Sequence, residues 1–303
     1  MTASPPASLA SVGLALLAAI TWGGGDFAGG MGVKRAGGST HGALRVVISA
    51  HAMSLLVLLG VLGWQQAALP HGLPLICGLA AGVAGGLSLT AFYVALARGA
   101  MGASAAVSGL LAAAIPAFVA LWTEGAPGSV RVLGFALAAG AIWLIAAGPV
   151  DPGSQTPAET RTITMLAIGG GIGFGFYFVF LHFADSLGVV EPMTLARMGS
   201  LCTCLLLLVF FRSKPQDHSP KSTAWLSRSA WLWAGGVALL DTGGNLLFVA
   251  ASRTGRLDVP AVLASLYPAS TILLAAALLK ERPSTRQFLG MGLAVAAVVL
   301  ITV

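Results

Sequence analysis

The chain has 303 residues, of which 57% are hydrophobic and 9% are charged, and its mean hydropathy is +0.90. Because soluble globular proteins carry roughly 25% charged residues, this composition excludes a soluble protein and indicates a membrane protein. The net charge of +6 is therefore interpreted as a sign of membrane topology and does not indicate a nucleic-acid partner.

Long apolar windows separated by polar, Pro or Gly breaks predict ten membrane-spanning helices. A span uses about 20 apolar residues, so ten spans with short loops take up nearly the whole chain and leave no separate soluble domain. The windows are apolar on all sides, whereas strands of a membrane barrel alternate, so a barrel is excluded. The predicted spans are residues 9–31, 41–64, 73–97, 102–122, 130–148, 163–184, 192–211, 230–251, 257–279 and 286–303.

An internal repeat divides the chain near its middle. Residues 108–124 (SGLLAAAIPAFVALWTE) match residues 265–281 (SLYPASTILLAAALLKE) at an offset of 157. The predicted units are residues 1–148 and 162–303, joined by a linker at 149–161 that is rich in Pro, Ser and charge. Five spans are an odd number, so the second unit enters the membrane from the opposite side. The predicted fold class is an all-α membrane protein of ten transmembrane helices, built as two inverted five-helix repeats, an architecture typical of transporters.

Several motifs carry a resemblance to a known family. They are WGGGDF at residues 22–27, Arg45 and Arg197 near the starts of the second and seventh spans, the run 268–281, and RQFLG at 286–290. Over both halves the chain resembles the EamA-type transporters of the drug/metabolite transporter superfamily. The resemblance implies a transporter and not an enzyme. It leaves the cargo open, because members carry amino acids, sugars, choline-like cations, nucleotide precursors and drugs in either direction.

The fourth span departs from the family's pattern. Leu111 stands where the family has a proline, and Pro116 follows five residues later. The sequence therefore does not support an identical bend in the fourth and ninth spans.

The basic residues are distributed unevenly between the two sides of the membrane. Of 16 Lys and Arg, 12 fall at the junctions of spans 1/2, 3/4, 5/6, 7/8 and 9/10, and four fall on the other side. Basic loops stay in the cytoplasm, so the count favours both termini outside. The family resemblance implies both termini in the cytoplasm, and the two alternatives stay open.

Two acids, Asp26 and Asp241, lie well inside apolar spans. A charge at the bilayer centre costs at least about 2.5 kcal/mol, so a buried acid usually faces a cavity or a partner. Neither acid is repeated, because Asp26 aligns with Phe178 and Asp241 with the glycines at 85–86. We interpret both as candidates for substrate binding and proton coupling, Asp241 first because it is the deeper. A structural ion pair or hydrogen bond is the alternative for each.

Other polar and aromatic side chains at similar depths complete the candidate substrate site. Asn245 lies one helical turn after Asp241 and either orients the acid or contacts cargo. Aromatic rings with a polar atom favour a cavity position over a lipid-facing one. These candidates are Trp22, Tyr93, Tyr177 and Tyr267. The glycines at 23–25 also suggest local unwinding of the first span beside Asp26. His51 and His182 are either proton relays or interhelical hydrogen-bond partners.

An aromatic cavity with one or two carboxylates suits an organic cation or the ammonium end of a zwitterion. The leading hypothesis is therefore a secondary active transporter of a small amphipathic metabolite, an exporter of amino acids or related amines by alternating access, coupled to protons. The alternatives are an importer of sugars or other neutral solutes and, more remotely, a non-transporting receptor or assembly subunit.

No nucleotide-binding motif, catalytic cluster or metal-ligand spacing occurs, so neither an enzyme, a cofactor nor a metal is expected. The expected partners are a small-molecule substrate and membrane lipid, the expected location is the bacterial inner membrane, and the oligomeric state, a monomer included, stays open.

Overall fold

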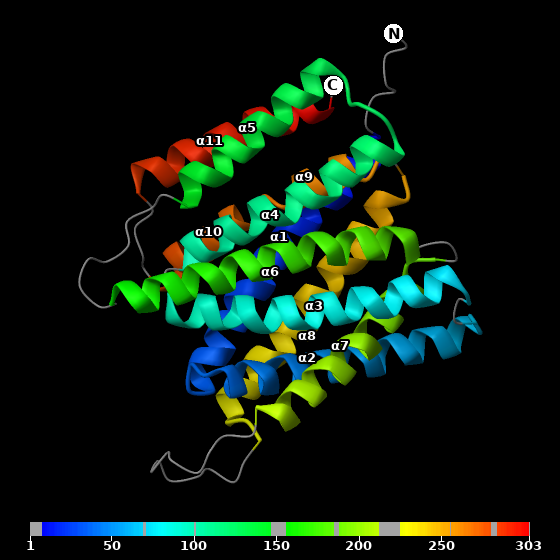
Figure 1. The fold of residues 1–303 in the computed structure, drawn as a ribbon, viewed down its shortest axis with the longest axis vertical. Helices are drawn as coiled ribbons and strands as arrows, with labels where there is room; N and C mark the ends of the chain where they lie inside the picture. The colour runs from blue at the N-terminus through cyan, green and yellow to red at the C-terminus, as the bar shows by residue number, and fades with distance from the viewer. Residues whose placement is uncertain are drawn as a thin grey trace.

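The computed structural model describes residues 8–68, 71–99, 101–146, 156–184, 188–211, 225–254, 256–279 and 284–302. These ranges form α-helices joined by short turns and contain no strand. The helices (Figure 1) are α1 (Leu9–Arg35), α2 (Thr40–Gln65), α3 (Leu73–Arg98), α4 (Met101–Thr123), α5 (Ser129–Ala146), α6 (Pro157–Ala184), α7 (Val190–Phe210), α8 (Arg228–Ser252), α9 (Asp258–Ala264), α10 (Tyr267–Leu279) and α11 (Thr285–Thr302).

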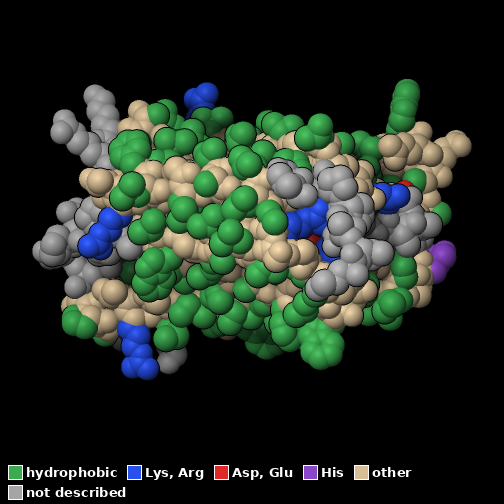
Figure 2. All heavy atoms as spheres, turned by 90° about the horizontal axis from the view of Figure 1, so that it is seen from above, with side chains coloured by type: hydrophobic (Ala, Val, Ile, Leu, Met, Phe, Trp, Pro, Cys, Tyr) green, Lys and Arg blue, Asp and Glu red, His purple; other side chains and the backbone are tan. Residues whose placement is uncertain are grey.

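Eight helical stretches of the described chain are long and apolar enough to cross a membrane, and the stretch formed by α9 and α10 is one of them. The other two apolar helices, α5 and α11, are shorter. Hydrophobic side chains extend from end to end of the face that Figure 2 shows, and few Lys or Arg side chains emerge from it. The prediction of an all-helical, multi-pass integral membrane protein is confirmed, whereas the count of ten spans stays a prediction.

The sixth helix begins earlier than the sequence predicts. α6 starts at Pro157, inside the predicted linker 149–161, of which residues 149–155 lie outside the described part. Thr156 and Glu159 cause this early start: the backbone N–H of Thr156 donates to Glu159 Oε2 at 2.8 Å, and the N–H of Glu159 donates to Thr156 Oγ1 at 3.3 Å. This reciprocal cap satisfies N–H groups that a helix start otherwise leaves unpaired, and proline suits the first helical position.

The predicted span 257–279 is divided into two helices. α9 ends at Ala264 and α10 begins at Tyr267, with a turn at residues 265–266. Pro268 explains the break, because it has no N–H to donate to the carbonyl four residues earlier and its ring crowds that carbonyl. In contrast, α4 continues unbroken through Pro116. The fourth and ninth spans therefore differ, as the departure at Leu111 suggests.

Glycines let α1 approach its neighbours closely. A Cβ at Gly25 would lie 3.2 Å from the backbone nitrogen of Asp241 on α8, and one at Gly29 would overlap the ring of Tyr93 on α3. The helix is continuous from Leu9 to Arg35. The predicted unwinding at residues 23–25 is therefore wrong, and these glycines serve close packing between helices instead.

The two halves of the chain interlock. The most extensive helix contacts join α1 to α8, α3 to α6 and α7, α4 to α6, and α5 to α11. Each of these pairs takes one helix from before residue 148 and one from after residue 156. Figure 1 shows α5 and α11 side by side at one edge of the bundle. The centre of the molecule is therefore an interface between the halves.

Candidate substrate site

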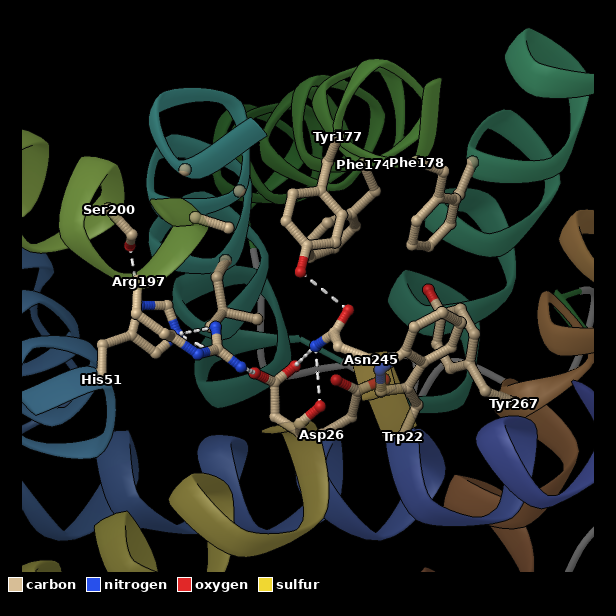
Figure 3. A pocket seen from close by; sticks show the side chains of 16 residues that line it. Trp22, Asp26, His51, Phe174, Tyr177, Phe178, Arg197, Ser200, Asn245 and Tyr267 are labelled. Atoms are coloured by element: carbon tan, nitrogen blue, oxygen red, sulfur yellow. Dashed lines mark hydrogen bonds and ion pairs between the residues drawn. The ribbon is translucent and has the colours of Figure 1, made fainter. Parts of the chain in front are cut away.

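A cavity of about 520 Å³, part of it open space at its mouth, lies in this interface. Both halves contribute to its lining: Trp22, Asp26 and His51 come from α1 and α2, and Arg197 and Asp241 come from α7 and α8. Figure 3 shows these side chains converging from separate helices, with aromatic rings on one side and the Arg197–His51 group on the other.

Six of the seven predicted site residues line this cavity. They are Trp22, Asp26, Tyr177, Asp241, Asn245 and Tyr267. Tyr93 lies elsewhere: it is 0% exposed, packs against Gly29, and its hydroxyl points to the carbonyl of Gly25 at 3.5 Å. The structure thus places Tyr93 between α1 and α3 and not in the cavity lining.

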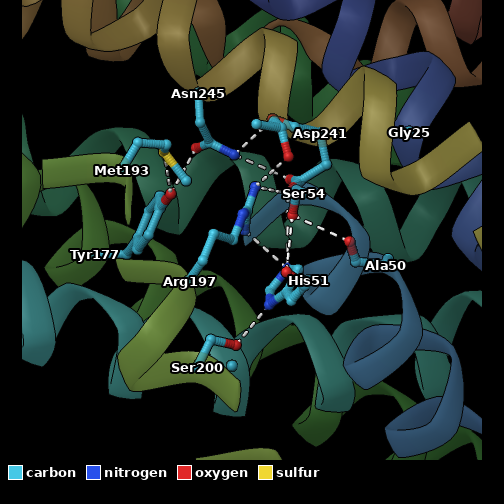
Figure 4. Close-up of polar contacts among 12 residues, drawn as sticks. Gly25, Ala50, His51, Ser54, Tyr177, Met193, Arg197, Ser200, Asp241 and Asn245 are labelled. Carbon is cyan, nitrogen blue, oxygen red and sulfur yellow. Dashed lines mark hydrogen bonds and ion pairs between the residues drawn. The ribbon is translucent and has the colours of Figure 1, made fainter. Parts of the chain in front are cut away.

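Asp241 has a partner inside the bundle. Arg197 Nη2 donates to Asp241 Oδ2 at 2.5 Å and to Thr242 Oγ1 at 3.0 Å (Figure 4). Arg197 is 3% exposed and the Asp241 side chain is 14% exposed, so the pair is largely shielded from water. Removing one member of a buried ion pair leaves an uncompensated charge, so the two residues must be considered together.

His51 extends this pair toward α2. Arg197 Nη1 lies 2.8 Å from His51 Nε2, and His51 Nδ1 lies 2.7 Å from Ser200 Oγ. A guanidinium can only donate, so His51 Nε2 accepts and the ring hydrogen is on Nδ1, from which it is donated to Ser200. His51 is therefore neutral in this arrangement and links α2 to α7. The geometry supports its interpretation as an interhelical hydrogen-bond partner.

Asn245 and Tyr177 continue the network on the other side of Asp241. Asn245 Nδ2 donates to Asp241 Oδ1 at 3.1 Å and to the Asp241 carbonyl at 2.7 Å, while its Oδ1 accepts from the Tyr177 hydroxyl at 2.8 Å. The i, i+4 spacing on α8 brings the amide to the acid. A continuous set of hydrogen bonds thus joins α2, α7, α8 and α6 around the cavity.

Asp26 has no such partner. Its side chain is 8% exposed, and no Lys, Arg or His of the described chain forms an ion pair with it. Beside it, Trp22 stacks on Phe178 with ring centroids 5.1 Å apart. The cavity therefore combines an acid without a counter-charge and an aromatic wall.

Tyr267 lines the cavity next to the break between α9 and α10. As the first residue of α10, it donates its hydroxyl to the carbonyl of Ala105 on α4 at 3.2 Å. Divided helices are a common way for transporters to present polar groups near the midplane.

Sequence reasoning missed the role of Arg197. Its recurrence as Arg45 favoured a scaffold role, yet the two arginines differ. Arg45 donates to the Trp225 carbonyl at 3.4 Å and lies over the Trp225 ring. The sequence did contain a sign of this role, because Arg197 lies inside a predicted span. A cation buried there needs a partner, just as a buried acid does. Phe174, Phe178 and Ser200 also line the cavity, and no sequence signal distinguished them from packing residues.

Comparisons with known proteins agree with this architecture. No curated protein matches the chain. A solved structure, described only as a crystal structure of a protein, superposes with a TM-score of 0.67 at 14% identity, over 92% of this chain and 98% of the other. At that identity the match shows the fold alone.

The family comparison identifies the second half of the chain. Residues 161–303 match the model of the EamA-like transporter family, whose members are membrane transporters of small solutes. The predicted resemblance is thus confirmed for residues 161–303, which match the EamA-like transporter family of the drug/metabolite transporter superfamily.

Proposed function

We propose that the protein is a secondary active transporter of a small amphipathic solute that carries an ammonium group, an amino acid or a related amine. The observation that carries this proposal is Asp26, a buried carboxylate without a described counter-charge, on the wall of a cavity between the halves. A cation that enters the cavity supplies the charge that Asp26 lacks.

The aromatic wall supports the same class of solute. The stacked rings of Trp22 and Phe178 offer a face to an ammonium group or to an apolar side chain. Cation–π attraction of this kind is worth about 2 kcal/mol when the groups are desolvated. An amphipathic cargo with a cationic end and an apolar body uses both features.

We assign proton coupling to Asp26 in preference to Asp241. Asp241 already has Arg197 and Asn245 as partners, so a proton there would disrupt an existing ion pair. Asp26 has room for either a proton or a cationic cargo. Competition between the two for one carboxylate couples their movement, because the empty, charged form is costly to bury.

Two inverted five-helix units remain our model of the transport cycle. The cavity is lined from both halves, and the two shorter helices α5 and α11 are the last of each unit. Each has 18 residues, and about 1.5 Å per residue gives each roughly the thickness of a hydrocarbon core. Rocking of the units about the cavity gives alternating access. We propose the bacterial inner membrane as the location and export as the direction.

Import of a sugar or another neutral solute is the second candidate. The Tyr177–Asn245 pair and the Trp22 ring favour it, since hydroxyl and amide groups bind sugar hydroxyls and an indole stacks on a sugar ring. Such a solute would leave the charge of Asp26 unmatched.

Ligand-induced stabilisation of the purified protein separates these candidates. Because a ligand that binds the folded state raises its stability by mass action, 3-methylbutylamine and leucine should raise the unfolding temperature and glucose should not. Asp26→Asn should abolish this rise in unfolding temperature. Glu159→Gln, which also replaces an acid by its amide but lies at an exposed helix cap, should retain it. Stabilisation by glucose alone, or shifts unaffected by Asp26→Asn, would contradict the proposal.

A further inference from the structure

The guanidinium of Arg197 has a hydrogen-bond donor that its protein partners leave unpaired. Nη1 bonds to His51, and Nη2 bonds to Asp241 and Thr242. Nε is buried and has no hydrogen-bond partner among the described residues. The contact with Asp241 therefore runs through one nitrogen only, although a guanidinium can bind a carboxylate through two parallel N–H groups.

We propose that Arg197 forms a carboxylate-binding subsite in the cavity, where the Nε and Nη2 edge of the guanidinium receives the anionic end of the cargo. A buried, charged donor without an acceptor is costly, so an incoming carboxylate is favoured by satisfying Nε. Arginine suits this task better than lysine, because its planar fork matches the two oxygens of a carboxylate.

The surrounding contacts allow Nη2 to be shared without leaving Asp241 unpaired. Asn245 Nδ2 donates to Asp241 Oδ1 at 3.1 Å, whereas Arg197 contacts Oδ2. His51 holds the guanidinium at Nη1, and Thr242 accepts from Nη2 alongside Asp241. A cargo carboxylate can thus enter while Asp241 keeps the amide and Arg197 keeps His51.

This inference rests on the proposed function and makes it more specific. Asp26 and Arg197 both line the cavity, and Figure 3 shows them on different sides of Asn245. One site binds the ammonium group and the other the carboxylate, so a zwitterion is held at two points and a plain amine at one. The protein is thereby selective for amino acids over amines of the same carbon skeleton.

Three probes of one skeleton test the inference: leucine, 3-methylbutylamine, which lacks the carboxylate, and 4-methylpentanoate, which lacks the ammonium group. Equilibrium binding to the full-length protein should favour leucine over 3-methylbutylamine by about tenfold or more, the scale of one charge-assisted bidentate contact. The double variant Arg197→Gln/Asp241→Asn replaces the ion pair by two amides that still hydrogen-bond. It should remove this preference, so that leucine and 3-methylbutylamine bind with similar affinities.

Asp26→Asn is the matched control at the other subsite. It should weaken the binding of 3-methylbutylamine while leaving that of 4-methylpentanoate unchanged or tighter, the reverse of the double variant. If wild-type protein binds the amine as tightly as leucine, or if the double variant folds and keeps the preference, the subsite at Arg197 is refuted. Should the double variant fail to fold, the wild-type comparison of the three probes decides alone. Binding of none of the three by wild-type protein would instead overturn the proposed function.

Discussion

At the scale of single residues, the Arg197–Asp241 pair has a structural role as well as one in the cavity. Breaking a buried pair by removing one partner costs about 3–5 kcal/mol, because the other charge is left unpaired. We predict that Asp241→Ala lowers the free energy of unfolding by this amount, whereas Arg197→Gln/Asp241→Asn loses clearly less. Denaturant unfolding in a fixed detergent measures both. Equal losses in the two variants would show that the charges act independently.

The sequence indicates candidate site residues where polar atoms interrupt apolar runs, which is why Asp26, Asp241 and Asn245 were predicted. It could not predict their partners, because Arg197 and His51 approach from other helices. Tyr93 and Tyr177 looked equivalent in the sequence. Only the packing of α3 against Gly29 of α1, and of α6 against Asn245 of α8, distinguishes a buried ring from one that lines the cavity.

At the scale of helices, close approach between α3 and α7 depends on Gly82. A Cβ there would overlap the carbonyl of Ala196 and lie 2.7 Å from the backbone nitrogen of Ser200. We predict that Gly82→Ala separates the helices and lowers stability by about 1–3 kcal/mol, the range for overpacking. Gly60→Ala is the matched control, because nothing lies within 4 Å of its Cβ position. Thermal unfolding of both variants in detergent checks this, and a Gly82→Ala protein as stable as Gly60→Ala would contradict the packing.

A charged cluster outside the spans ties α4 to the start of α9. Arg256 donates to the carbonyls of Glu124 and Gly125 at 2.9 and 2.8 Å and pairs with Asp258 at 2.9 Å. The hydrogen bonds that Arg256 donates to the Asp258 carboxylate raise the pKa of Arg256 above its already high ordinary value. Its stabilising effect is complete below that ordinary pKa and is lost only in strong alkali, so the tie is constant around neutral pH.

We predict that Arg256→Gln loosens this tie and increases amide hydrogen exchange at residues 124–128 and 256–259, because two backbone carbonyls lose their donor. Exchange at residues 40–60, on α2, serves as the internal reference. Unchanged exchange at both segments would mean that the end of α4 and the start of α9 stay together without Arg256.

Helix positions followed closely from hydropathy, since most predicted boundaries lie within two residues of those observed, from α1 through α11. The exceptions have local causes. The first span continues to Arg35, α6 starts early at the Thr156–Glu159 cap, and the ninth span breaks at Pro268. Apolar windows do not register caps, and Pro116 shows that proline alone does not decide a break.

At the scale of the whole molecule, orientation in the membrane depends on the basic side chains. Arg197 was counted on the less basic side, but it is buried in the centre of the bundle. Removing it from the loop count strengthens the asymmetry. We therefore predict that a reporter fused to the C-terminus is active outside the cytoplasm. Cytoplasmic activity would show that the orientation implied by the family overrides the charge count.

The interlocking of the two halves could not be predicted from the repeat. A repeat indicates two similar units, but the extensive pairing of α1 with α8 and of α3 with α6 arises from glycine-lined helix faces that meet only in three dimensions. Because the cavity lies in that interface, the same contacts that hold the halves together also shape the substrate site.

The most direct test of this account measures proton movement through the purified protein in proteoliposomes under an imposed gradient of leucine or 3-methylbutylamine. If cargo and protons compete for Asp26, wild-type protein and Glu159→Gln move protons against the cargo flow. Asp26→Asn moves no protons under the same gradient. Normal cargo-driven proton movement in Asp26→Asn would contradict the assignment of coupling to Asp26, and absence of any cargo flux in wild-type protein would contradict the transport function proposed for these solutes.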